Sequence, residues 1–149
     1  MKYYSMKKIL GTSLLIFIFF LPGLSQKSNK LKMQDMYNAI KDAGIEQPDF
    51  VMAQSIKETG WLNCKRCCLR YHNLFGFYKS ENKCMRFDSD KECLNYYKKW
   101  QGKHYPKWKK KHLKGTYYDF LKYSKYATSK TYNQELKGFV AWVRKNLKL

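Results

Sequence analysis

Acidic side chains are scarce in this chain, and one of them, Glu58, stands where a glutamate can act as an acid catalyst. The 149 residues contain 30 Lys and Arg but only 11 Asp and Glu. Glu58 closes a mostly apolar segment that begins at Pro48 and stops at Gly60. Burial there would raise the pKa of the carboxyl group, and such a carboxyl can donate a proton near neutral pH. The alternative is an ordinary glutamate at a helix end.

Hydrophobic spacing predicts the helices that must position Glu58. Met33, Met36, Tyr37 and Ile40 repeat at helical spacing, and Gly44 is placed to end that helix. Residues 48–59 form a second helix, because Pro48 suits a first helical turn and Gly60 a stop. Glu58 then lies near the carboxyl end of a buried helix.

The remaining segments predict more helix and one hairpin. The expected elements are a polar leader over 27–30, an irregular loop over 62–73, hairpin strands at 74–78 and 85–87, capping boxes at Ser89 and Thr131 that open helices, and a short helix over 117–125. We therefore expect one α+β domain, mostly helical, with a small hairpin.

The first 25 residues predict an export signal. A basic start is followed by the apolar run Ile9–Leu21, which is shorter than the roughly 20 residues of a membrane-spanning helix. Cleavage before Gln26 would leave domain 26–149 and lower the net charge from +19 to +16. An uncleaved anchor is the alternative. We expect a periplasmic or secreted protein, without a stable membrane anchor after cleavage.

Five cysteines lie beyond the predicted signal, at positions 64, 67, 68, 84 and 93. Export favours disulfides, but an odd number leaves at least one thiol free or paired between chains. Cys64 and Cys67 supply half of a zinc-ligand pattern, and no second half follows. We therefore predict disulfides and no metal or other cofactor. One hypothesis joins the loop of Cys64–Cys68 to Cys84.

Four ordered motifs resemble the bacterial glucosaminidases of glycoside hydrolase family 73, which include flagellar muramidases and autolysins. The motifs are Ala53–Trp61 (AQSIKETGW), Asn73–Gly76 (NLFG), Phe87–Ser89 (FDS), and Tyr126–Thr128 (YAT) followed by Tyr132. With their flanks they extend from about Asp35 to about Val143, nearly all of the predicted mature chain.

The resemblance implies a lysozyme-like fold and hydrolysis of the β-1,4 bond after N-acetylglucosamine in peptidoglycan. Glu58 would be the general acid, and Tyr126 would line the groove and orient the sugar. Trp61, Asn73, Phe75 and Tyr132 would bind substrate. Trp61 and Phe75 can equally be core packing, and Asn73 can equally cap a turn.

A second carboxylate is harder to identify. Glycosidases usually use two, and Glu81 is the acid expected in the hairpin lobe. Glu81 sits in a predicted turn, where a solvated role is the alternative, and assistance by the substrate's N-acetyl group is another. Leu62 replaces a glycine frequent in the family, the hairpin is short, and Ser129-Lys130 replaces an Asp-Pro.

The large positive charge fits an anionic partner. We predict a monomer that acts on peptidoglycan glycan strands and has no specific nucleic-acid partner. The alternatives are a lytic transglycosylase, a non-catalytic wall-binding module, and an exported nucleic-acid-binding protein that uses the lysines and aromatic residues of 98–114.

Overall fold

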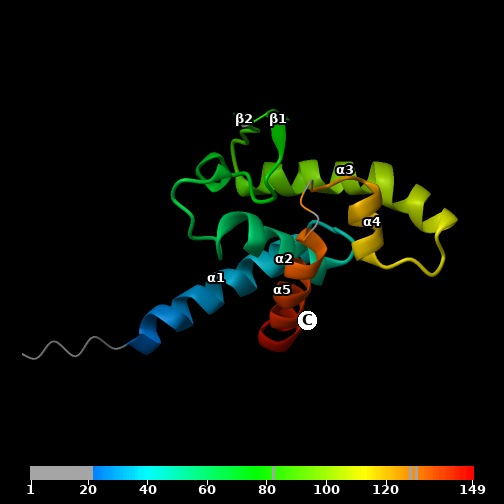
Figure 1. The fold of residues 1–149 in the computed structure, drawn as a ribbon. Helices are drawn as coiled ribbons and strands as arrows, with labels where there is room; N and C mark the ends of the chain where they lie inside the picture. The colour runs from blue at the N-terminus through cyan, green and yellow to red at the C-terminus, as the bar shows by residue number, and fades with distance from the viewer. Residues whose placement is uncertain (1–21, 82, 128, 130) are drawn as a thin grey trace, which may run out of the picture.

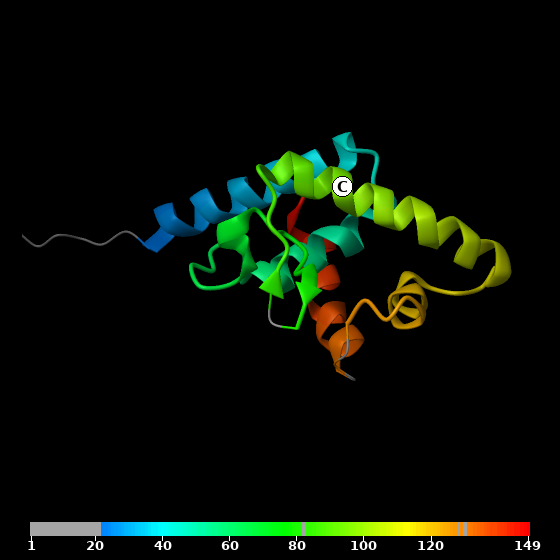
Figure 2. The same cartoon turned by 90° about the horizontal axis from the view of Figure 1, so that it is seen from above.

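Helices make up most of the structure, a computed structural model that describes residues 22–149 except 82, 128 and 130. The described elements are α1 (Pro22–Asp42), α2 (Pro48–Thr59), the 3₁₀ helix η1 (Cys68–Tyr71), β1 (Tyr78–Ser80), β2 (Lys83–Cys84), α3 (Asp90–Lys111), α4 (Tyr117–Tyr123) and α5 (Tyr132–Asn146). The two strands pair antiparallel beside the first half of α3 (Figures 1 and 2). The predicted mostly helical α+β fold with a small hairpin is confirmed.

Helix α2 is the centre of the packing. Every residue from Phe50 to Ile56 is buried, and the helix contacts both α1 and α5. Pro48 occupies the first turn, and Gly60 ends the helix in the left-handed conformation with its N–H bonded to the Ile56 carbonyl. The predicted bounds of this helix are confirmed, and they place Glu58 in its last turn.

Two helices are longer than the sequence pattern predicts. Residues 27–30, predicted as a polar leader, belong to α1, because no glycine or proline interrupts the chain between Gly23 and Gly44. Helix α3 continues through Pro106 to Lys111. Within the described residues, no helix is sufficiently long and apolar to cross a membrane. The apolar run 9–21 lies outside them, so the export signal stays a prediction.

The predicted hairpin exists, but its strands are shifted. Leu74 and Phe75 are buried in the core rather than paired in a strand. The reason is Asn73, whose side-chain amide donates to the Phe77 and Met85 carbonyls at 2.7 and 3.0 Å and accepts from the Phe77 N–H at 3.0 Å. These bonds close the base of the hairpin at Phe77 and Met85, where the Met85 N–H also donates to the Phe77 carbonyl at 2.9 Å, and the two strands lie beyond this point.

A disulfide joins Cys68 of η1 to Cys84 of β2. The predicted disulfide between the 64–68 loop and Cys84 is thus present. Because the strands contain only three and two residues, the disulfide and the Asn73 amide add fixed links at the base of the hairpin, beside the packing of Phe77 on Tyr96 and Trp100 of α3.

One of the two predicted capping boxes is wrong. Ser89 caps α3 by accepting from the Glu92 N–H at 3.2 Å, which is half of the predicted box; the Glu92 carboxylate accepts in return from the Asp88 N–H at 2.6 Å rather than from that of Ser89. Thr131 makes no such bond at α5, because its hydroxyl donates to the Glu135 carboxylate at 2.6 Å. A capping box that the sequence analysis missed opens α4, between Thr116 and Asp119.

A buried polar network ties three helices together. The Tyr97 hydroxyl donates to Gln54 Oε1 at 2.7 Å and lies 2.9 Å from the Tyr117 hydroxyl. Gln101 Nε2 donates to the Tyr117 hydroxyl and to the Glu46 carbonyl, both at 2.8 Å. Buried polar groups are costly unless paired, so this network fixes how α3 and α4 sit against α2.

Candidate functional site

The Glu58 side chain lies against the start of the hairpin segment. A Cβ atom placed on Gly76 would come within 2.6 Å of Glu58 Oε2. Gly76 also has φ +65°, a conformation that glycine adopts without strain. The turn at Gly76 therefore lets the backbone approach the carboxylate closely.

Glu58 is half-buried, and burial raises the pKa of its carboxyl group above the ordinary 4.5. Smaller effects of the Tyr132 hydroxyl and of Lys57 act in the opposite direction. Lys57 Nζ is itself bonded to the Glu135 carboxylate at 2.5 Å, which leaves less of its charge to stabilise an ionised Glu58. A carboxyl with a raised pKa is suited to donating a proton.

A small cavity of about 230 Å³ opens beside Glu58. Its other lining residues are Arg66, Cys67, Cys68, Arg70, Gly76, Tyr78 and Cys84. Glu58 is the sole carboxylate among these lining residues, and two guanidinium groups accompany it. The loop after α2, η1 and the hairpin thus enclose one acid in a basic, disulfide-bordered cavity.

The two predicted site tyrosines lie together. Among the described residues, only the Tyr126 hydroxyl has a hydrogen-bond partner. Tyr126 Oη donates to the Phe75 carbonyl at 2.6 Å, and its ring centroid is 5.9 Å from that of Tyr132. The Tyr132 hydroxyl is buried and has no hydrogen-bond partner among the described residues. Burial and the neighbouring Glu58 raise the pKa of both hydroxyls, so both stay protonated as donors.

Two further buried polar atoms on α2 have no partner among the described residues, Gln54 Nε2 and Ser55 Oγ. In addition to burial, Glu58 raises the pKa of the Tyr132 hydroxyl and Gln54 lowers it, so this hydroxyl lies near both side chains. Gln54 is not among the site residues predicted from the sequence. Its position four residues before Glu58, on the same helix face, was the available signal.

Glu58 is the only predicted site residue that lines the cavity beside it; the others, Tyr126, Tyr132, Trp61, Asn73, Phe75 and Glu81, are absent from its lining. The Asn73 side chain makes its hydrogen bonds at the base of the hairpin. Phe75 packs in the core, and its ring centroid is 4.3 Å from that of Tyr97. Trp61 has φ +63°, and its ring packs edge-on against Phe139 and Trp142 of α5. Glu81 is exposed beside β1. Asn73 and Phe75 therefore support the site from beneath, while Trp61 extends toward α5.

Residues that the sequence analysis did not single out also shape the cavity. Arg66, Arg70 and Tyr78 come from the irregular segment and the hairpin, and only the fold brings them to Glu58. These three residues could be recognised from the sequence only if the Cys68–Cys84 bond were known, because that bond holds η1 against β2.

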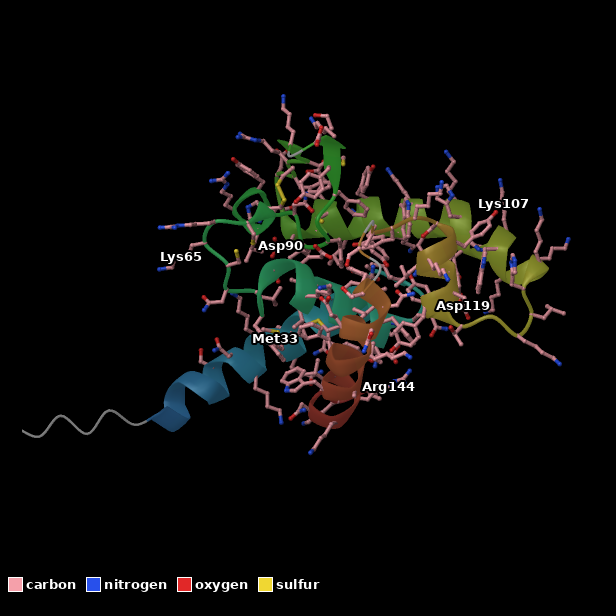
Figure 3. The ribbon with its side chains drawn as sticks, in the orientation of Figure 1. Met33, Lys65, Asp90, Lys107, Asp119 and Arg144 are labelled. Atoms are coloured by element: carbon pink, nitrogen blue, oxygen red, sulfur yellow. A yellow bond between two sulfur atoms is a disulfide. The ribbon has the colours of Figure 1, made fainter. Side chains whose placement is uncertain are left out.

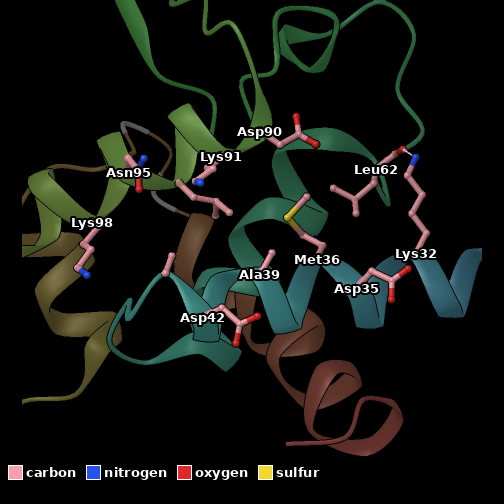
Figure 4. A pocket seen from close by; sticks show the side chains of 12 residues that line it. Lys32, Asp35, Met36, Ala39, Asp42, Leu62, Asp90, Lys91, Asn95 and Lys98 are labelled. Carbon is pink, nitrogen blue, oxygen red and sulfur yellow. Dashed lines mark hydrogen bonds between the residues drawn. The ribbon is translucent and has the colours of Figure 1, made fainter.

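A larger cavity lies elsewhere, between α1 and the first half of α3 (Figure 4). It measures about 810 Å³ and has an apolar floor that includes Met36, Ala39 and Leu94. Lys32 borders it and donates to the Leu62 carbonyl at 2.5 Å. Glu58 is absent from its lining, so this cavity is separate from the one described above.

None of the three histidines, His72, His104 and His112, lines the Glu58 cavity. The group of ligands needed for a metal site is also missing: no cluster of three or more His, Cys, Asp or Glu occurs among the described residues. His72 instead pairs with Asp90 at 2.8 Å, and His112 stacks on Trp108.

The structure thus places one glutamate at the end of α2, with the turn at Gly76 and the hairpin against it. The comparisons with known proteins agree. A glucosaminidase family model, described as mannosyl-glycoprotein endo-beta-N-acetylglucosaminidase, matches residues 33–144, or 112 of 149 residues. The chain belongs to this glucosaminidase family, and membership suggests a glycoside hydrolase that acts on glycans. No curated protein and no solved structure matches the chain.

Proposed function

We propose that this chain is an exported peptidoglycan hydrolase that cleaves the β-1,4 bond after N-acetylglucosamine, with Glu58 as the general acid. The observation that carries the proposal is the contact of the half-buried Glu58 carboxyl with the Gly76 turn inside a basic cavity. The protonated carboxyl would donate its proton to the glycosidic oxygen as the bond to the leaving sugar breaks.

The Tyr132 hydroxyl is the best-placed partner for substrate. It is a buried donor close to the Glu58 carboxylate, and it makes no hydrogen bond of ordinary geometry with any described residue. A hydrogen bond to the sugar or to its N-acetyl group would give this hydroxyl a partner. Tyr126 would act one step removed, because its hydroxyl holds the Phe75 carbonyl and so fixes the segment that leads to Gly76.

The composition of the cavity lining favours a route with one protein carboxylate. Glu81 and Asp88 are both exposed, and neither lines the cavity with Glu58. We therefore favour assistance by the substrate's N-acetyl group over direct attack by a second side chain. A cavity with one carboxylate also fits a lytic transglycosylase, which uses a single glutamate, and this is the alternative function.

Basic side chains would bring the enzyme to an anionic wall. Exposed lysines follow α3 outward to Lys107 and beyond, and Lys65 projects from the loop after α2 (Figure 3). Such a surface attracts polyanions without reading a specific sequence. Peptidoglycan with its attached anionic polymers is the partner we propose, outside the cytoplasmic membrane.

The deciding experiment is digestion of purified peptidoglycan by residues 26–149 and by the Glu58→Gln variant, with mass spectrometry of the released ends. Reducing N-acetylglucosamine ends from the wild type, lowered about 10²–10⁴-fold in the variant, support the proposal. Glu81→Gln is the matched control and should retain activity. Anhydro-muramic ends would instead assign a transglycosylase, and wall binding without cleavage would assign a binding module.

A further inference from the structure

Two cysteines at the edge of the Glu58 cavity remain unused by the fold and by the proposed reaction. Cys68 and Cys84 are bonded to each other, and Cys93 is completely buried in the core. Cys64 and Cys67 are both free thiols and partly accessible. They lie in the bend that connects α2 to η1, and Cys67 lines the cavity.

The bend brings these two cysteines into direct contact. The Cys67 N–H donates to Cys64 Sγ at 3.1 Å, and the Cys67 thiol donates to the Cys64 carbonyl at 3.6 Å. The start of the bend is held in place, because the Cys64 N–H donates to the Thr59 carbonyl at 3.0 Å. Each cysteine therefore touches the other through both backbone and sulfur atoms.

The two thiols differ in their surroundings. A hydrogen bond from the Cys67 thiol is the main cause that lowers the pKa of Cys64, and N–H groups of Arg66 and Cys67 add to it. Burial is the main cause that raises the pKa of Cys67. Lys65 and Arg66 stand between the two and are exposed. Cys64 is thus the better thiolate, in a basic and accessible setting.

We propose that Cys64 and Cys67 form a redox-active dithiol at the edge of the Glu58 cavity, which exchanges with low-molecular-weight disulfides. The contact between the two cysteines carries this inference. It does not rest on the hydrolase activity.

The exchange takes two balanced steps. The Cys64 thiolate attacks one sulfur of a disulfide R–S–S–R, which forms the mixed disulfide Cys64–S–S–R and releases one R–S⁻. Cys67 then loses its proton to solvent and attacks Cys64 Sγ, which forms the Cys64–Cys67 disulfide and releases the second R–S⁻. Both released thiolates take up protons. The protein loses two electrons, and the small disulfide gains them.

This pairing also accounts for the odd number of cysteines. With Cys64–Cys67 and Cys68–Cys84 both oxidised, the single remaining thiol is Cys93. The Cys93 side chain is inaccessible, it accepts a hydrogen bond from the Leu74 N–H at 3.4 Å, and burial raises its pKa to about 12. Such a thiol is inert toward exchange and presents no reactive surface.

The test is a redox titration of residues 26–149 with mixtures of reduced and oxidised glutathione. Free thiols are alkylated at each ratio, and labelled positions are assigned by sequencing the peptides by mass spectrometry. We expect Cys64 and Cys67 to lose their labels together in one two-electron transition. Cys68, Cys84 and Cys93 should stay unlabelled in the native protein across the same ratios.

Two single variants separate the roles of the thiols. In Cys67→Ser, where the serine hydroxyl and the backbone N–H of residue 67 can still donate to Cys64 Sγ, Cys64 should accumulate the mixed disulfide with glutathione faster than Cys67 does in Cys64→Ser. Labels on Cys64 and Cys67 that do not depend on the glutathione ratio would overturn the proposal, as would equal rates in the two variants. The readout needs no glycan, so it stands or falls separately from the hydrolase assignment.

Discussion

The Glu58 carboxylate and the Gly76 backbone are in direct contact, since any Cβ on Gly76 would lie 2.6 Å from Glu58 Oε2. Glu58 belongs to the helix at the centre of the core, whereas Gly76 begins the hairpin. The position of the Glu58 carboxylate therefore depends on the position of the hairpin, and a change in either should alter the other.

Gly76→Ala is the most direct test of that contact. The new methyl group would displace the Glu58 carboxylate and would hold alanine at φ +65°, which costs about 1–3 kcal/mol. We expect lower stability in urea unfolding and a loss of peptidoglycan cleavage. Gly138→Ala is the control, because nothing lies within 4 Å of its added Cβ on α5, and it should be neutral or stabilising. Full activity in Gly76→Ala would show that Glu58 does not need its present position.

The raised pKa of Glu58 predicts how stability depends on pH. Burial favours the neutral carboxyl, so the folded-state pKa lies above the ordinary 4.5. Ionisation then costs stability as the pH rises above that value, and the cost is absent at lower pH. Glu58→Gln should therefore be more stable than the wild type at pH 7, and the difference should vanish near pH 4.

Thermal unfolding of both proteins between pH 4 and 8 measures this difference. Glu81→Gln serves as the exposed counterpart and should change stability little at any pH. The cleavage rate should also fall on the alkaline side as Glu58 ionises. A Glu58→Gln variant that is less stable than wild type at pH 7 would mean that the ionised carboxylate is favourably bound.

The sequence predicts an element well where the residues that start and end it are close to it in the chain, and poorly where distant residues set its limits. Helix α2 was predictable at both ends because Pro48 and Gly60 act locally. The hairpin strands were misplaced because their start is set by the Asn73 amide, which bonds backbone groups four and twelve residues away. The polar network of Tyr97 and Gln101 gave no local signal, because polar residues on a helix are ordinarily exposed.

The same division holds for the site. Glu58 was identifiable from its apolar helix and the residues that follow it. The direction of Trp61 was not, because the positive φ values of Trp61 and Leu62 turn the chain toward α5. Arg66 and Arg70 reach the cavity only through the folding of the disulfide-bonded segment. Local pattern thus located the acid, and long-range packing determined what surrounds it.

The buried polar network should be sensitive to a single oxygen atom. Tyr97→Phe would leave Gln54 Oε1 without its donor in the core, at a cost of about 1–3 kcal/mol. Tyr96→Phe, at the neighbouring exposed position, is the matched control and should cost little. Chemical unfolding measures both variants. Equal stabilities of the two would show that the Tyr97 hydroxyl contributes nothing to the packing of α3 on α2.

The lysines of α3 predict a salt-dependent association with the wall. Lys103 and Lys107 are exposed, and replacing both with glutamate would change the net charge by four. We expect weaker pelleting with peptidoglycan at low salt and a smaller loss on addition of salt. Replacing both with glutamine separates loss of charge from reversal of charge, and it should have about half the effect. Unchanged pelleting of the glutamate variant would place the wall contact on another face.

The Cys68–Cys84 disulfide should stabilise the hairpin more than its two short strands do. The bond closes a segment with a sequence separation of 16, for which loop-closure entropy corresponds to about 3 kcal/mol. The paired replacement Cys68→Ser with Cys84→Ser should lower the unfolding free energy by that order and reduce cleavage, because both cysteines border the Glu58 cavity. Thermal unfolding with and without a reductant provides the measurement. The wild type should lose stability when reduced, whereas the paired variant should not respond. The variant with Cys64→Ser and Cys67→Ser is the control, because it lacks the proposed redox pair and keeps the Cys68–Cys84 bond, so its loss of stability on reduction reports on that bond alone.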